Sequence, residues 1–140
     1  MKKYILTTVI LMFAFLGTSK AQSFKIIVNN SNSISSLSKK EISDLFLKKK
    51  TKWTDGTNVN PVDLNASAKT REDFSQQIHG KGTSAIRSFW QQAAFSGTAS
   101  APPEKASDAE IIDFLKKNPG AIGYVSASAN TEGVKVIEVK

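Results

Sequence analysis

The chain has 140 residues, 19 basic and 12 acidic side chains, a formal net charge of +7 and no cysteine. The lack of cysteine excludes disulfides, thiolate metal sites, cysteine nucleophiles and a lipid on an N-terminal cysteine. One histidine and scattered acidic residues form no pattern typical of a metal centre. We therefore expect neither a metal nor any other cofactor.

The first 21 residues have the features of an export signal. Two lysines follow the initiator methionine, residues 4–16 are mostly apolar, and small residues stand at positions 19 and 21. The apolar run is shorter than the roughly 20 residues that a membrane-spanning helix needs. We expect a signal peptide over 1–21 and a periplasmic domain over 22–140 with no membrane span. Loss of three lysines with the signal lowers the net charge from +7 to +4.

Strand and helix patterns alternate along the rest of the chain. The expected elements are a strand over 24–28, a helix over 38–49, a strand over 59–64, helices over 70–79, 83–94 and 107–117, and strands over 121–125 and 134–139. Strands separated by helices favour a mixed sheet covered by helices on both faces. The sequence therefore predicts one three-layer α/β domain, a mixed β-sheet flanked by helices.

Capping and turn residues set the predicted boundaries. The sequences SKKE at 38–41 and SDAE at 107–110 are capping boxes, in which a serine hydroxyl and a glutamate carboxylate bind reciprocal backbone N–H groups. Thr83 is expected to cap the third helix, and Gly80 to end the second. Pro61 predicts an edge strand or a gap in strand pairing, because proline has no N–H to donate.

The segment Ser67-Ala68-Lys69-Thr70-Arg71 lies at a predicted strand-to-helix junction and is unusual in its charge. Helix N-termini expose unpaired N–H groups and carry partial positive charge, so Lys69 and Arg71 are unfavourable there unless an anion is bound. The alternative is an ordinary helix cap by Thr70 with Asp73, with the basic side chains extending into water. The residues themselves leave both interpretations open.

Other polar residues give weaker signals. Asn30 and Ser31 follow the first strand and are secondary binding candidates, because ligands of open α/β sheets bind beyond the carboxyl ends of strands. His79 lies near a helix end, where a favourable charge or a partly exposed position explains it, and no nearby motif predicts catalysis. The lysines within 48–52 also follow a helix C-terminus without an aromatic platform, so nucleic-acid binding is not expected.

Two segments resemble the periplasmic phosphate-binding proteins of ABC transporters. They are residues 45–74, with the Trp-Thr-Asp-Gly turn and the Ser/Thr/Lys/Arg loop, and residues 119–125, which read Pro-Gly-Ala-Ile-Gly-Tyr-Val. The resemblance extends over about residues 24–127. It implies one lobe of a type II periplasmic-binding-protein fold, a phosphate or similar oxyanion as ligand, a transporter permease as a possible partner, and no enzymatic activity.

The resemblance also implies site residues. In the family, the loop reads like Arg-x-x-Ser-Ser-Gly-Thr-Arg, and its hydroxyls, N–H groups and arginine hold phosphate. Ser67, Thr70 and Arg71 match this pattern, and Lys69 adds a positive charge. We therefore predict an oxyanion site at Ser67, Lys69, Thr70 and Arg71.

Three departures from the family pattern support an alternative function. Leu64 stands where the family has its first arginine, Ala68 replaces a serine, and Lys69 replaces the glycine. The chain also corresponds to one lobe, whereas family members close two lobes over the ligand. The alternative is a non-catalytic scaffold that has lost the anion site and binds a protein or envelope partner near Trp53 and the lysines at 48–50. A different interpretation of Trp53, as a core aromatic beneath the turn, is favoured.

Overall fold

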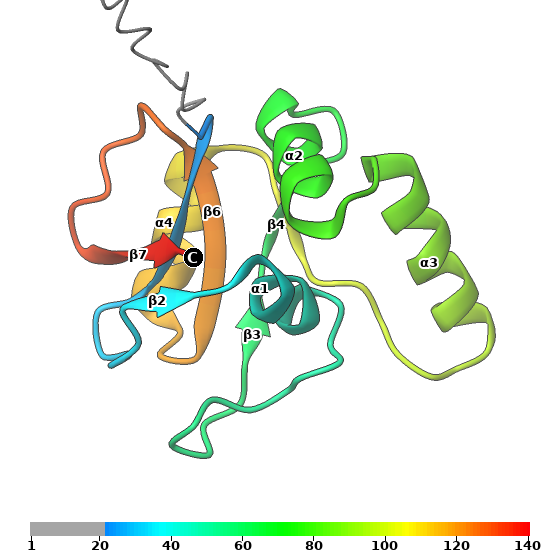
Figure 1. Cartoon of the computed structure of the whole chain (residues 1–140), viewed down its shortest axis with the longest axis horizontal. Helices are drawn as coiled ribbons and strands as arrows, with labels where there is room; N and C mark the ends of the chain where they lie inside the picture. Colours follow the sequence, from blue (N-terminus) through cyan, green and yellow to red (C-terminus); the bar gives the residue numbers. More distant parts are fainter. Residues whose placement is uncertain (1–21) are drawn as a thin grey trace, which may run out of the picture.

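The computed structural model describes residues 22–140, so the predicted signal peptide lies outside the described residues (Figure 1). In chain order the elements are β1 (Phe24–Asn29), β2 (Ser36–Leu37), α1 (Lys39–Phe46), β3 (Asn60–Pro61), β4 (Asp63–Leu64), α2 (Lys69–Phe74), the π-helix η1 (Ser75–His79), α3 (Thr83–Phe95), β5 (Glu104–Lys105), α4 (Asp108–Lys117), β6 (Ala121–Ser126) and β7 (Val134–Val139). Within these residues no helix has the length and hydropathy needed to cross a membrane.

Five strands form one mixed sheet in the order β2-β7-β1-β6-β3. The central strand β1 is antiparallel to β6 and to β7, whereas β2 and β3 run parallel to their neighbours. A separate parallel pair joins β4 to β5. The predicted mixed α/β sheet is thus confirmed, although the two-residue strands β2 and β5 were not predicted.

Alternation along β6 assigns the two faces of the sheet. Gly123 faces α4, because a Cβ at this position would lie 3.0 Å from Ile111 and 3.1 Å from Leu115. Tyr124 points to the opposite face, where its ring stacks on Phe74 of α2 with centroids 3.8 Å apart. Figure 1 shows α4 behind the sheet and α1 and α2 on the other side, which gives the three expected layers.

A close backbone contact explains why a glycine, Gly120, directly precedes β6. A Cβ on Gly120 would lie only 2.0 Å from the carbonyl oxygen of Asn58, so the two backbones touch. The Gly120 carbonyl accepts hydrogen bonds from the Trp53 indole at 3.0 Å and from the Asn60 N–H at 2.9 Å. Trp53 is therefore a buried core residue beneath the turn, as favoured from the sequence, and the alternative of an exposed aromatic at this position is wrong.

Both predicted serines cap their helices, but only the first of the two predicted capping boxes forms in full. Ser38 makes the full capping box with Glu41, with reciprocal bonds of 2.7 and 3.1 Å. Ser107 accepts from the Glu110 N–H at 3.2 Å, but the Glu110 carboxylate binds the N–H of Ala106 instead. The first of these helices, α1, ends at Phe46 rather than near residue 49.

Two other predicted caps are wrong. Helix α3 is preceded by Gly82, and Thr83 instead donates its N–H to the Glu72 carboxylate at 2.9 Å. Helix α2 is preceded by Ala68 without any side-chain cap, so Thr70 does not cap it with Asp73.

The predicted strand over 59–64 is interrupted at Val62, and its halves β3 and β4 pair in different sheets. β3 is the edge strand of the five-stranded sheet, which confirms the edge position that Pro61 predicted as one of two possibilities.

Candidate functional site

The predicted oxyanion loop lies directly between β4 and α2 (Figure 1). A bond of 3.2 Å from the Ala68 N–H to the Asn65 carbonyl closes the turn, and the Ser67 hydroxyl donates to the Asn65 side chain at 2.8 Å. Within residues 22–140, the backbone N–H groups of Ala66, Ser67, Lys69 and Thr70 have no protein acceptor. The loop therefore presents a short run of free donors of the kind that helix N-termini offer to anions.

Lys69 and Thr70 sit at the start of α2 in helical backbone. Among the described residues other than glycine, only Lys48 has a positive φ, so lysine replaces the family glycine without backbone strain. The Lys69 ammonium is exposed and pairs with Asp73 at 2.9 Å. Lys69 and Ser23 both bind the Asp73 carboxylate and lower its pKa. Thr70 is half-buried, and its hydroxyl makes no hydrogen bond within the described chain.

Arg71 turns away from these three residues and is only 3% exposed. Its guanidinium donates to the Leu64 carbonyl at 2.7 Å and to Glu104 at 3.2 Å, and its Nε lies 3.7 Å from Asp63. Through these contacts Arg71 joins the end of β4, at Asp63 and Leu64, to β5, at Glu104. The structure therefore gives Arg71 internal acceptors, whereas Ser67 and Lys69 lie on the surface.

Asp63 is the central acid of this buried network. Burial raises the pKa of Asp63 to about 6, against the lowering effects of Arg71 and of the Tyr124 hydroxyl. That hydroxyl donates to Asp63 at 2.8 Å and accepts from the Leu64 N–H at 3.2 Å. Burial and the Asp63 charge raise the pKa of Tyr124, so the phenol stays protonated. The tyrosine of the Gly-Ala-Ile-Gly-Tyr motif thus positions β4, which leads into the loop.

The secondary candidates lie at the other end of the sheet. Val28 pairs with Ile122, so β1 ends beside the start of β6, whereas the loop follows β4 toward the end of β6 near Tyr124. The Ser31 N–H and hydroxyl both bind the Asn29 side chain, at 2.9 and 2.8 Å. The structure therefore does not bring Asn30 and Ser31 to the predicted loop.

A contact between Ser43 and His79 was missed from the sequence. The Ser43 hydroxyl lies 2.7 Å from His79 Nδ1, although the two residues are 36 positions apart. Burial, followed by the charges of Arg71, Lys49 and Lys81, lowers the pKa of His79 to about 4. His79 is consequently neutral at pH 7, so of the two explanations expected from the sequence the favourable charge is wrong, whereas the partly exposed position is confirmed. Only the general rule that neutral histidines pair with hydroxyls could have indicated such a contact.

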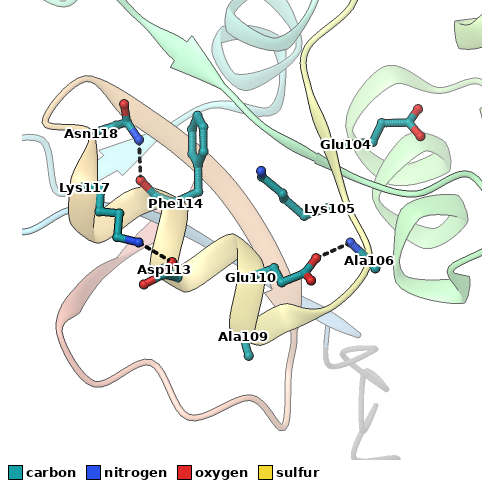
Figure 2. Close-up of a pocket in the computed structure, with 9 residues that line it drawn as sticks. All are labelled: Glu104, Lys105, Ala106, Ala109, Glu110, Asp113, Phe114, Lys117 and Asn118. Atoms are coloured by element: carbon teal, nitrogen blue, oxygen red, sulfur yellow. Dashed lines mark hydrogen bonds and ion pairs between the residues drawn. The ribbon is translucent and has the colours of Figure 1, made fainter.

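A hollow of about 660 Å³ lies between β5 and α4 (Figure 2). Three carboxylates line it, from Glu104, Glu110 and Asp113. Figure 2 shows that its polar groups bind one another: Lys117 pairs with Asp113 at 2.9 Å, and Glu110 accepts from a backbone N–H. This composition does not favour an anion. No group of three or more potential metal ligands occurs among residues 22–140.

The lysines at the end of α1 do not form one basic surface. Lys48 donates to the Ser100 carbonyl at 2.8 Å and lies 5.9 Å from the Trp90 ring centroid. Lys52 instead donates to Asn58 at 2.7 Å.

No protein-family model and no curated protein sequence matches the chain. Solved structures do match. An ABC-type phosphate transport receptor from Vibrio cholerae superposes with a TM-score of 0.65 at 17% identity, over 82% of this chain and 45% of the receptor. This chain shares the fold of that phosphate transport receptor, and it spans less than half of the receptor's length.

Two further structures agree with this assignment of the fold. A putative phosphate ABC transporter substrate-binding protein from Clostridium perfringens, with bound phosphate, gives a TM-score of 0.63 at 21% identity, over 84% of this chain and 44% of that protein. A possible phosphate-binding protein from Planctomyces limnophilus gives 0.62 at 14% identity, over 84% and 41%. The resemblance seen in the sequence is thus confirmed at the level of the fold.

Proposed function

We propose that this chain is a periplasmic solute-binding-like protein that binds phosphate or a similar oxyanion in connection with phosphate ABC transport. The observation that carries the proposal is the junction of β4 and α2, with four N–H groups that have no acceptor among residues 22–140, the hydroxyls of Ser67 and Thr70, and the Lys69 ammonium. Hydrogen bonds to a charged acceptor are the stronger kind, and an oxyanion accepts several at once.

Arg71 has a supporting part in this proposal. Its bond to the Leu64 carbonyl and its ion pair with Asp63 fix the end of β4, from which the loop departs. The phosphate ligands are then Ser67, Lys69, Thr70 and the loop N–H groups, and Arg71, whose charge is paired with Asp63 and Glu104, contributes by holding the strand that leads into the loop. Because the loop faces solvent, screening weakens each charge interaction, and we expect a dissociation constant of about 1 mM, or roughly −4 kcal/mol.

The test is a phosphate titration of matched lysine variants. Lys69 and Lys40 both form i,i+4 pairs with an aspartate, at 2.9 and 2.7 Å, with side chains 87% and 83% exposed. Lys69→Ala and Lys40→Ala therefore remove the same charge and the same kind of ion pair. We expect Lys69→Ala to weaken phosphate binding by about 1 kcal/mol and Lys40→Ala to leave it unchanged.

Variants that lack the hydroxyl of Ser67 or Thr70 test the same site independently of charge. Ser67→Ala and Thr70→Ala each remove a neutral donor and should cost about 0.5–1.5 kcal/mol of binding free energy. Neither residue caps a helix, so the free energy of unfolding should change little. Equal losses in the Lys69 and Lys40 variants, or unchanged affinity in both hydroxyl variants, would refute binding at this loop.

The second candidate is a non-catalytic scaffold that binds a protein or envelope partner. Its surface cannot include the buried Trp53, but α3 offers another: Phe95 is 97% exposed, and Phe89 is also exposed. Figure 1 shows α3 at the side of the molecule, away from the sheet. Absence of any saturable response to phosphate or sulfate at tens of millimolar would favour this scaffold function.

A further inference from the structure

A second polar cavity lies at the junction of α1, η1 and α3, with a volume of about 210 Å³. Four of its lining residues are polar or basic: Ser43 from α1, Lys49 from the turn after it, His79 at the end of η1, and Lys81 just beyond. No carboxylate lines this cavity. It therefore differs in charge from the acidic hollow of Figure 2 and shares no residue with the loop after β4.

The charges that act on His79 are all positive. They come from Arg71 on α2, from Lys49 after α1 and from Lys81 before α3. The imidazole is held 2.7 Å from the Ser43 hydroxyl, and its ring lies edge-on to Phe74 with centroids 5.5 Å apart. Two exposed lysines, a serine and a fixed imidazole thus line a space without a carboxylate, which is an arrangement that suits an anion.

The remaining lining residues are apolar. Leu47 follows α1, and Ala85, Ile86 and Phe89 lie on α3. An inorganic anion would leave these side chains without a partner, whereas a ligand with a short hydrocarbon group would contact them and gain affinity from each methylene that it buries. The volume is below the roughly 300–1,000 Å³ of pockets for drug-sized ligands, so only a small molecule fits.

We propose that this cavity binds a small monocarboxylate with a short apolar tail, with Lys49, Lys81, Ser43 and His79 at the carboxylate and Leu47, Ile86 and Phe89 around the tail. The site is separate from the oxyanion loop and does not depend on the proposed phosphate function. Burial is the larger cause of the lowered pKa of His79 and remains when the site is filled, but an anion placed there offsets the positive charges that also lower it, so the pKa of His79 rises from about 4.

The test uses NMR of the purified protein with three probes of different charge. His79 is the single histidine of the chain, so its ring resonances need no further assignment. We expect butyrate to shift them saturably at millimolar concentrations and to raise the pKa of His79, whereas butylamine, of similar size and opposite charge, leaves them unchanged. Sulfate should act more weakly than butyrate. Ring resonances that do not respond to butyrate, or that respond equally to sulfate or butylamine, overturn the proposal.

Matched variants locate the binding within the cavity. Lys49→Gln and Lys50→Gln remove adjacent exposed lysines, of which only Lys49 lines the cavity. We expect Lys49→Gln to weaken butyrate binding about threefold to fivefold and Lys50→Gln to have no effect. Ala85→Leu fills the cavity from a helical position without changing charge and should abolish the butyrate shift. Equal affinities in the two lysine variants, or full binding by Ala85→Leu, contradict the assignment. Phosphate titration of the loop variants above is unaffected by either result.

Discussion

Replacing Arg71 by alanine is expected to destabilise the fold by about 3–5 kcal/mol, the range for breaking a buried ion pair by removing one partner. The loss has two parts. Asp63 is left buried without its cation, and the Leu64 carbonyl loses a donor at 2.7 Å. Urea unfolding monitored by tryptophan fluorescence measures the change, because Trp53 and Trp90 are both buried.

The matched control is Arg87→Ala. Arg87 borders the same cavity of about 300 Å³ as Arg71 but is exposed and makes no ion pair among the described residues. Its replacement should change the free energy of unfolding by less than about 0.5 kcal/mol. A double variant, Arg71→Met with Asp63→Leu, removes both charges together and should be more stable than Arg71→Ala. If Arg71→Ala unfolds at the same urea concentration as Arg87→Ala, the arginine does not support the fold.

The second large effect concerns the pH dependence of stability. The pKa of Asp63 is raised to about 6 in the folded protein, so its contribution is present below its ordinary value near 3.8 and is lost as pH rises through 6. The pKa of His79 is lowered to about 4, so its contribution is present above 6.5 and is lost as pH falls toward 4. Each of these pKa shifts corresponds to about 3 kcal/mol of unfolding free energy. The two contributions change in opposite directions with pH, so they nearly cancel between pH 4 and 6.

Single variants should separate these contributions. Asp63→Asn removes the contribution that falls with pH, so the free energy of unfolding should increase more steeply from pH 4 to 6.5 than in the unmodified protein. His79→Gln removes the contribution that rises with pH, so the free energy of unfolding should decrease between pH 5 and 6, above the range in which the carboxylates of lowered pKa titrate. Urea titrations at several pH values measure both slopes. Slopes of the same sign in the two variants would show that the burial of these groups has been assigned wrongly.

The helices with local signals could be predicted from the sequence. Ser38, Glu41 and Ser107 act within one turn of their own helices, so their bonds follow from residues three positions apart. Phe74 and Ile78, four positions apart in the helix predicted over 70–79, are likewise buried. By contrast, β2 and β5 are only two residues long and form only because a distant strand pairs with each of them.

The orientation of the site residues depended on contacts far apart in the sequence. Arg71 matches the family loop, but Glu104, 33 positions away, and the buried Asp63 draw it inward. His79 meets Ser43 across α1 and η1, which no local pattern indicates. Ser67, Lys69 and Thr70 did fall where the sequence placed them, at a strand-to-helix junction, because their position depends only on the adjoining elements.

The most direct test of the account is to map phosphate binding by NMR of backbone amides. The free donors of the loop predict that the amides of Ala66, Ser67, Lys69 and Thr70 move most, in a saturable manner, with a dissociation constant near 1 mM. The amides at the end of β1, at Asn30 and Ser31, should not move. Saturation of shifts confined to other parts of the chain, or no saturation at tens of millimolar phosphate, would contradict an oxyanion site at this loop.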